Sequence, residues 1–434
     1  MIPSLVNLAA ACLVVSPGSG SHAGADRCPG ALTVHQAQDG GLVRVRIPGG
    51  MLPARVLAAL GDWSAELGNG RMELTGRGNL QLRGLMSGAE DELATRLSTH
   101  GLLPSPAHDR ARNVLASALS GRDGLGALDV RPLVAELDRR LCASVELAEL
   151  PGRFLFALDD GRGDVAGMRA DAAVLGLPGQ RFALQLGGQD SGLRLPARVA
   201  VTALLVSAQV FLRRRVDERV WRVAELPGGP LTVVPEIELV LGGDVTSGPR
   251  VTVPERNPHG TVGRIEQTDG RVALAVGVPL GELTQGRCKL LAELAERQVV
   301  LTPWHGVVLT DLSPSAVGAA MSRLVGAGLV LDPTAPALGV SACTGRPGCA
   351  SALADVRADA LAEEPAAAAV AGPQASWSLP VHWSGCARRC GRPTGPVVDV
   401  VAGEDGYQVL RDGELFFAGA QADSVRAAAM RARR

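Results

Sequence analysis

Four of the eight cysteines lie in two closely spaced pairs near the C-terminal end of the chain. Cys343 and Cys349 bound a C-x5-C loop, Cys386 and Cys390 bound a C-x3-C turn, and 36 residues separate the two pairs. Four thiolates that converge from two loops can hold a [4Fe-4S] cluster, with one sulfur on each iron. The spacing therefore predicts an iron-sulfur site.

Two other kinds of site fit the same residues. A zinc site usually spaces its paired cysteines by about two to four residues, and the five-residue loop lies outside that range. Two disulfides would need an oxidising compartment, for which the sequence gives little support. Both alternatives stay open at this point. The other cysteines are isolated, and we expect ordinary thiols at Cys12, Cys28, Cys142 and Cys288.

Arginines form a second group of residues that can do chemistry. Lys289 is the only lysine, so nearly every fixed positive charge is a guanidinium. Guanidinium groups that converge on a cleft bind carboxylates through paired hydrogen bonds. We predict such a site, for a ligand with several carboxylates, from arginines at the ends of strands that belong to an internal repeat. The alternative for each arginine is a solvated strand edge. The arginines concerned are Arg44, Arg46, Arg77, Arg112 and Arg153.

The composition excludes several classes of protein. The 434 residues include 43 Lys plus Arg and 44 Asp plus Glu, a formal net charge of -1. This balance argues against a general nucleic-acid binder, which needs a basic face. With 46% hydrophobic residues, the chain can fill the cores of about two to four domains and is not disordered over most of its length.

The N-terminal residues do not resemble a membrane span or a typical secretory signal. The apolar run Leu8–Val15 is shorter than the roughly 20 residues that cross a bilayer, and no Lys or Arg precedes it. We expect residues 1–26 to be a disordered extension or the product of an early start codon. We also expect a cytoplasmic protein without a membrane segment.

The elements that must position these residues form an internal repeat. A strand, a Gly/Pro turn, an amphipathic helix and a second strand occur twice, which predicts a duplicated α+β fold. The first copy comprises 42–47, 53–67 and 71–83, and the second comprises 271–276, 283–296 and 298–311. Helical patterns at 130–141 and 350–363 follow the two copies at corresponding places. The prediction is four pieces around a pseudo-twofold axis, with a cleft between them.

Three motifs resemble the sulfite and nitrite reductase superfamily. Thr75-Gly-Arg77-Gly-Asn-Leu80-Gln81 is similar to the family's T-x-R-x-x-[IL]-Q strand, Arg112-Asn113-Val114 to its R-N-V turn, and the cysteine pairs to its cluster ligands. The resemblance covers about residues 27–395. It implies two ferredoxin-like half-domains and two α/β cofactor-binding half-domains, with a [4Fe-4S] cluster that a cysteine bridges to sirohaem.

Domain boundaries and site residues follow from that resemblance. The expected divisions are an extension at 1–26, ferredoxin-like half-domains at 27–100 and 241–332, and α/β domains at 101–240 and 333–434, the last one carrying the cluster. Cys343, Cys349, Cys386 and Cys390 would ligate the cluster, with Cys390 as the bridging ligand. The substrate site would comprise Arg46, Arg77, Arg112, Asn113 and Arg153.

The chain departs from the reductase pattern at two places. The reductases have an L-P-R-K-F-K segment whose two lysines hold and protonate the bound anion, but residues 150–155 are Leu-Pro-Gly-Arg-Phe-Leu. Their second cysteine pair usually has the sequence G-C-P-N-x-C, but residues 385–390 are Gly-Cys-Ala-Arg-Arg-Cys. A reduction that consumes several protons would suffer from the loss of these donors.

These departures are similar to the precorrin-3B synthases, the aerobic cobalamin-pathway branch of the superfamily. Cys28-Pro29-Gly30, Leu301-Thr-Pro-Trp304 and Ala342-Cys343-Thr-Gly345 also resemble that branch, although His305 replaces the expected arginine. The resemblance implies a monooxygenase that uses O2 to hydroxylate precorrin-3A at C20, with lactone formation. Sirohaem-dependent sulfite or nitrite reduction is the alternative, and a cluster protein that only carries electrons is another.

The implied cofactors are the [4Fe-4S] cluster and a non-haem iron, with sirohaem only under the reductase alternative. No dinucleotide or flavin motif is evident, so the electrons must come from a ferredoxin or an NAD(P)H-dependent reductase. Iron that activates O2 often uses two histidines and one carboxylate. The candidates are His35, His259, His305 and His382, and none is assigned as a ligand.

Overall fold

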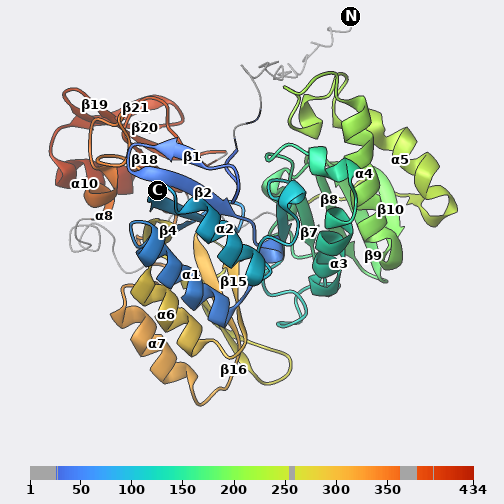
Figure 1. The fold of residues 1–434 in the computed structure, drawn as a ribbon, viewed down its shortest axis with the longest axis horizontal. Coiled ribbons are helices and arrows are strands. Elements are labelled where there is room, and N and C mark those ends of the chain that lie inside the picture. The colour runs from blue at the N-terminus through green and yellow to red at the C-terminus, as the bar shows by residue number, and fades with distance from the viewer. Residues whose placement is uncertain (1–25, 27, 254–259, 362–378, 394) are drawn as a thin grey trace, which may run out of the picture.

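The computed structural model describes residues 26, 28–253, 260–361, 379–393 and 395–434. Within these ranges the chain forms four β-sheets with helices packed on them (Figure 1). The expected N-terminal extension, except Asp26, lies outside the described residues, as does His259. No helix in the described ranges has the length and apolar character needed to cross a bilayer.

The first ferredoxin-like half has a five-stranded sheet in the order β1-β2-β5-β4-β14. Its elements are β1 (His35–Ala37), β2 (Gly40–Val45), α1 (Ala54–Leu67), β4 (Arg71–Leu74), β5 (Leu80–Leu85) and α2 (Glu90–Thr99), with β14 (Glu282–Thr284) added from the other half. The single strand predicted over 71–83 is wrong, because the chain reverses between β4 and β5. Gly78 in that turn has a φ of 63°, which glycine adopts without strain.

The second half repeats this arrangement in the order β12-β13-β16-β15-β3. Its elements are β12 (Gly263–Glu266), β13 (Val272–Gly277), α6 (Gln285–Leu294), β15 (Gln298–Thr302), β16 (Gly306–Leu312) and α7 (Val317–Gly326), with β3 (Met51–Pro53) added from the first half. The predicted strand over 298–311 is again two antiparallel strands. Helix α6 begins after Thr284, whose hydroxyl accepts the Arg287 N–H at 3.3 Å.

The two halves exchange a short strand, which locks them together. Strand β3 pairs with β15, and β14 pairs with β4. Each exchanged strand follows a 3-10 turn, Pro48–Gly50 or Pro279–Gly281. A Cβ on Gly50 would lie 2.0 Å from the carbonyl oxygen of Leu301, so only glycine fits there. The equivalent Gly281 lies against the Leu74 carbonyl, so the two turns and the exchanged strands that follow them correspond.

Two α/β domains complete the duplication. The first contains β6 (Val114–Ala116), α3 (Arg131–Cys142), β7 (Phe156–Asp159), β8 (Ala172–Leu177), β9 (Arg181–Leu186), β10 (Gln189–Pro196), α4 (Ala200–Arg214), α5 (Val234–Leu241) and β11 (Thr246–Ser247). The second contains β17 (Val340–Ala342), α8 (Val356–Leu361), β18 (Val381–Ser384), β19 (Val398–Gly403), β20 (Gly406–Arg411), β21 (Glu414–Gly419) and α10 (Ala422–Ala432). In both, two parallel pairings are followed by two antiparallel ones.

The two helices predicted at corresponding places are both present. Helix α3 matches the pattern at 130–141, whereas α8 is shorter than the pattern at 350–363, whose last two residues lie outside the described part. The Ala/Arg-rich pattern at 423–434 favours a solvated C-terminal helix, and the structure corrects this expectation. Arg433 is fully buried and donates to the carbonyl oxygens of Leu379 and Pro336.

The two ferredoxin-like sheets differ on the face that turns away from α1 and α6. In the first sheet, alternating residues of the central strands place polar side chains on this face: Arg44, Arg46, Glu73, Gln81 and Arg83. In the second sheet, the corresponding face is apolar and covered by Ala118 and Leu119; its residues are Ala273, Ala275, Val300 and Val308. Only the first sheet therefore offers a polar surface.

Candidate functional site

A row of polar side chains crosses the first sheet. Arg44, Gln81, Glu73 and Glu282 are partners in register on four adjacent strands. Arg44 Nη2 donates to Gln81 Oε1 at 2.9 Å, and Gln81 Nε2 donates to Glu73 Oε2 at 3.0 Å. These hydrogen bonds join the side chains of the three central strands.

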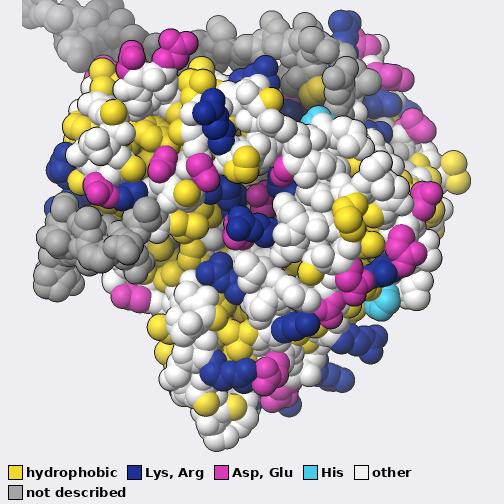
Figure 2. Space-filling view, turned by 60° about the vertical axis from the view of Figure 1, so that its left-hand side comes forward, with side chains coloured by type: hydrophobic (Ala, Val, Ile, Leu, Met, Phe, Trp, Pro, Cys, Tyr) yellow, Lys and Arg dark blue, Asp and Glu magenta, His cyan; other side chains and the backbone are white. Residues whose placement is uncertain are grey.

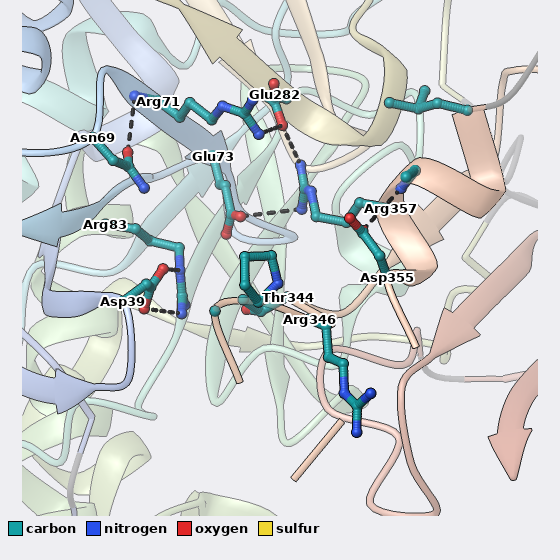
Figure 3. Close-up of a pocket in the computed structure, with 14 residues that line it drawn as sticks. Asp39, Asn69, Arg71, Glu73, Arg83, Glu282, Thr344, Arg346, Asp355 and Arg357 are labelled. Atoms are coloured by element: carbon teal, nitrogen blue, oxygen red, sulfur yellow. Dashed lines mark hydrogen bonds and ion pairs between the residues drawn. The ribbon is translucent and has the colours of Figure 1, made fainter. Parts of the chain in front are cut away.

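A cavity of about 650 Å³ lies between this face and the loop that follows β17 (Figure 3). Arg357 extends from α8 and bonds Glu73 at 3.1 Å and Glu282 at 3.0 Å. On the same face, Arg83 makes a two-point contact with Asp39 at 2.9 and 3.0 Å. Figure 2 shows basic and acidic side chains around a hollow in this side of the molecule.

The sequence did not single out the charged residues of this cavity. Arg83 lies two positions after Gln81 on β5 and so shares its face, which is a period-two signal that was available. Arg357 lies on a different element, and nothing in its sequence context marks it as a partner of this face. Glu73 and Glu282 could not have been paired from the sequence, because an exchanged strand brings them together.

Two arginines of the predicted carboxylate site are shielded from water, since Arg46 is buried and Arg77 is half-buried. Arg46 is 2% exposed and makes one hydrogen bond, from Nη2 to the Pro29 carbonyl at 3.3 Å. Its Nε and Nη1 atoms have no partner among the described residues. Burial, reinforced by the charge of Arg44, lowers the pKa of Arg46 to about 9. Burial and the charge of Arg222 lower the pKa of Arg77 to about 10. Both guanidinium groups would be stabilised by an anion.

Arg112 and Asn113 have other roles than the ones predicted. Arg112 is 4% exposed and holds Asp138 of α3 by two hydrogen bonds, at 2.7 and 2.8 Å. Asn113 is fully enclosed and donates to the Gly152 carbonyl at 2.8 Å. Their contacts within the protein satisfy both side chains, so they support the fold beneath the site instead of facing a ligand.

In the segment 150–155, which replaces the reductases' two lysines, Arg153 and Leu155 lie in different surroundings. Arg153 is exposed, and its guanidinium carbon lies 5.0 Å from the centre of the Trp221 ring. Leu155 is 3% exposed and lies in a small apolar cluster with Leu115 and Ala157. Lys289 is remote from both, because it lies on α6 and pairs with Asp62.

The four predicted cluster ligands lie on two neighbouring loops that follow β17 and β18. The Gly385 N–H donates to Cys343 Sγ at 3.1 Å. Burial raises the pKa of the Cys343 thiol, and the charges of Cys386 and Cys390 add to this rise, so these thiols lie within electrostatic range of one another. Cys349 closes the loop that borders the cavity, and the described cysteines are free thiols.

The residue types on the two loops fit an iron-sulfur cluster, but their side chains are not close enough together to bind one metal ion. Cysteine thiols are its usual ligands, and an N–H already directed at sulfur is typical of such sites. Over the described ranges, no three His, Cys, Asp or Glu side chains lie close enough to share one metal ion. The structure thus gathers the thiols on adjacent loops and leaves their ligation a prediction.

The described residues do not fit a two-histidine, one-carboxylate iron site. His35 is exposed on β1. Burial, with Arg357 next, lowers the pKa of His305 to about 4. His382 is fully enclosed, and both ring nitrogens have partners, Ser341 and the Cys390 carbonyl. The non-haem iron therefore keeps no assigned ligand.

Comparison with known proteins identifies the two similar halves. Residues 35–98 and 265–327 each match the nitrite/sulfite reductase ferredoxin-like half domain. Both halves are thus similar to this domain of the nitrite and sulfite reductases. A precorrin-3B synthase from Sinorhizobium sp. is 26% identical over 395 residues, which cover 89% of this chain and 82% of the relative. The superfamily resemblance predicted from the motifs is confirmed.

Reductases of the superfamily are about equally similar. A ferredoxin–nitrite reductase from Synechococcus elongatus is 26% identical over 426 residues, covering 86% of this chain and 78% of the relative. Among solved structures, Mycobacterium tuberculosis NirA superposes with a TM-score of 0.72 at 21% identity, over 89% of this chain and 79% of that one. The predicted duplicated fold is confirmed, and the relatives are oxidoreductases.

Proposed function

We propose that this protein is a precorrin-3B synthase, an O2-dependent monooxygenase that hydroxylates precorrin-3A at C20 with lactone formation in cobalamin biosynthesis. The observation that carries the proposal is a buried arginine, Arg46, two of whose guanidinium nitrogens have no partner among the described residues. Precorrin-3A and sirohaem are both ringed by acetate and propionate arms, so one arginine-lined frame can accept either. The similarity to the Sinorhizobium synthase supports the same choice.

The protein's own residues bind and orient the substrate in this proposal. Arg46 and Arg77 would each take a carboxylate arm, which restores the solvation their guanidinium groups lost on burial. Arg153, exposed beside Trp221, would contact an arm at the rim. Arg357 is already shared by Glu73 and Glu282, so it would not compete for the substrate unless those ion pairs opened.

Cys343, Cys349, Cys386 and Cys390 would hold the [4Fe-4S] cluster, which supplies electrons one at a time when bound. The Gly385 N–H would stabilise the charge on the Cys343 sulfur. A ferredoxin or an NAD(P)H-dependent reductase would deliver electrons from outside; the ferredoxin-dependent reductases among the relatives support this. No step is assigned to the non-haem iron, because the described residues offer no fitting ligand set.

Segment 150–155 favours oxygenation over sulfite or nitrite reduction. Reducing these anions consumes several protons, which acidic groups beside the bound oxygen atoms must deliver. Arg153 holds its proton too tightly for that role, Leu155 has none, and Lys289 lies elsewhere on α6. The alternative is a sirohaem-dependent reductase, and the similarity to the Synechococcus enzyme favours it.

Cofactor analysis and isotope labelling separate the two functions. Protein purified without oxygen should contain iron and sulfide but no bound sirohaem. Supplied with precorrin-3A, reductant and 18O2, it should form a product that carries the label, and it should show negligible sulfite or nitrite reduction with a strong artificial donor. Robust sulfite turnover by protein that contains sirohaem would refute the proposal and establish the reductase.

A further inference from the structure

Three polar side chains form a row across the sheet that carries the cysteine loops. Ser341, His382 and Asp399 are partners in register on β17, β18 and β19. They are 7%, 0% and 2% exposed. Polar groups this deeply buried destabilise a fold unless hydrogen bonds satisfy them, so their partners show what the row holds in place.

The hydrogen bonds of His382 connect the two cysteine loops. Its Nε2 lies 3.0 Å from the Cys390 carbonyl oxygen, and its Nδ1 lies 2.9 Å from Ser341 Oγ. A carbonyl oxygen only accepts, so Nε2 carries the hydrogen, and in the neutral ring Nδ1 accepts from the Ser341 hydroxyl. Because Ser341 precedes Cys343 by two residues, the ring ties the start of the first loop to the end of the second.

Asp399 holds the other side of the same turn. It accepts hydrogen bonds from Arg392 Nε at 2.9 Å and from Arg389 Nη1 at 3.4 Å. Cys390 lies between these arginines and is flanked by positive φ angles, 49° at Arg389 and 82° at Gly391. A non-glycine residue in the left-handed region needs support from its surroundings, and the buried row supplies it.

The other half of the duplicated fold lacks this row. The strands equivalent to β17, β18 and β19 are β6, β7 and β8, and their register places Leu115, Ala157 and Ala173 at the corresponding positions. All three are buried apolar residues of one cluster. The polar row therefore occurs only in the domain that carries the cysteine pairs, which argues against a general requirement of the sheet.

We propose that Ser341 and His382 are positioning residues that set Cys390 relative to Cys343 before a cluster binds. The inference rests on the cluster assignment of the proposed function. It concerns how the ligand loop is held, through hydrogen bonds to its backbone, and not which residues bind iron. A loop that is positioned in advance should bind the cluster without further ordering of the chain, and should release it slowly.

The chain contains a matched control for this test. His108 is 4% exposed, its Nδ1 lies 2.7 Å from Ser105 Oγ, and its Nε2 lies 2.8 Å from the Ser144 carbonyl. It thus makes the same pair of contacts as His382, but in the first α/β domain. His382→Leu and His108→Leu remove equivalent bonds, so they separate cluster positioning from general stability.

The measurements are the rate of iron release to a chelator under anaerobic conditions, and the rate at which iodoacetamide modifies Cys390 in the apoprotein. We expect His382→Leu to increase both rates by about tenfold or more, and His108→Leu to leave both at the wild-type value. Ser341→Ala, a milder change that keeps the fold if His382→Leu does not, should increase both rates severalfold. His382→Gln, whose amide can donate to the Cys390 carbonyl, should restore most of the protection.

Each outcome decides the question. Wild-type rates in His382→Leu and Ser341→Ala would overturn the inference, and so would an equal increase in His108→Leu. Cys390→Ser separates this inference from the proposed function. If that variant kept a full cluster, the ligand assignment itself would fail; if it lost the cluster while His382→Leu released iron normally, only the positioning role would fail.

Discussion

Arg46 should reduce the stability of the ligand-free protein because its charge is buried and two of its nitrogens have no partner among the described residues. A pKa of about 9, against an ordinary value of 12.5, corresponds to roughly 5 kcal/mol of unfavourable burial of the charge. Arg46→Met keeps most of the volume and removes the charge. The single hydrogen bond to Pro29 is lost at about 1 kcal/mol, so the gain is at most about 4 kcal/mol, and we expect the free energy of unfolding to rise by about 1–4 kcal/mol.

Arg112→Met is the matched control and should act in the opposite direction. Arg112 is equally buried, but its guanidinium is paired with Asp138 at two atoms. Its removal leaves the carboxylate without its partner, so we expect a loss of about 2–4 kcal/mol. Urea unfolding of both variants, followed by circular dichroism, measures the two changes on the same scale.

Ligand binding and pH give two independent checks on Arg46. Uroporphyrin, an octacarboxylate probe, should stabilise the wild-type protein, and Arg46→Met should lose most of that stabilisation. Between pH 9 and 12.5 the unfolded chain keeps a proton that folded Arg46 has released, so the wild-type protein gains stability from this group as pH rises. The difference between the two proteins should therefore narrow by about 1 kcal/mol from pH 8 to pH 10. If Arg46→Met were as destabilising as Arg112→Met, Arg46 would be a structural residue and the reasoning would fail.

Three further predictions concern the four paired cysteines, Arg77 and Arg357. Serine at any of the four predicted ligand positions should remove or destabilise the iron-sulfur chromophore, seen by absorbance and iron analysis, whereas Cys142→Ser should leave it intact; the four positions are Cys343, Cys349, Cys386 and Cys390. Arg77→Ala should weaken uroporphyrin binding by about 1.5–3 kcal/mol in a fluorescence titration without loss of the cluster; unchanged affinity would place the ligand elsewhere. Arg357→Gln should lower the free energy of unfolding by about 1–3 kcal/mol, because Glu73 and Glu282 would lose the cation they share and only the longer contact of Arg71 with Glu282, at 3.7 Å, would remain; a neutral result in urea unfolding would show that the cavity readily admits water to these carboxylates.

The repeat and the positions of its helices could be predicted from the sequence because hydrophobic periodicity is local. The hairpin turns at 75–79 and 303–305 were missed, although Gly76, Gly78 and Pro303 are turn signals that the sequence offers. The exchanged strands β3 and β14 are three residues each, too short for any periodicity to show. The domain boundaries remain predictions.

The substrate site remains a prediction, and the structure shows what a sequence leaves out. Arg46 is buried with two nitrogens that have no partner among the described residues, whereas Arg112 is paired with an aspartate 26 residues away on α3. A sequence shows that an arginine is present but not which acid lies opposite it after folding. Arg357 was not predicted as a site residue for the same reason, because its two partners come from different halves of the molecule.

The duplication explains why one site, and not two, is expected from two similar halves. The cavity lies between the first ferredoxin-like sheet and the loop that follows β17 in the second α/β domain. Under the pseudo-twofold relation, its counterpart lies between the second sheet and the chain that follows β6. There, register places Ser117 at the position of Cys343, and Ala118 and Leu119 fill the space against an apolar sheet face. One interface has thus become core and stabilises the assembly through buried apolar area, whereas the other keeps a charged face that lines a cavity.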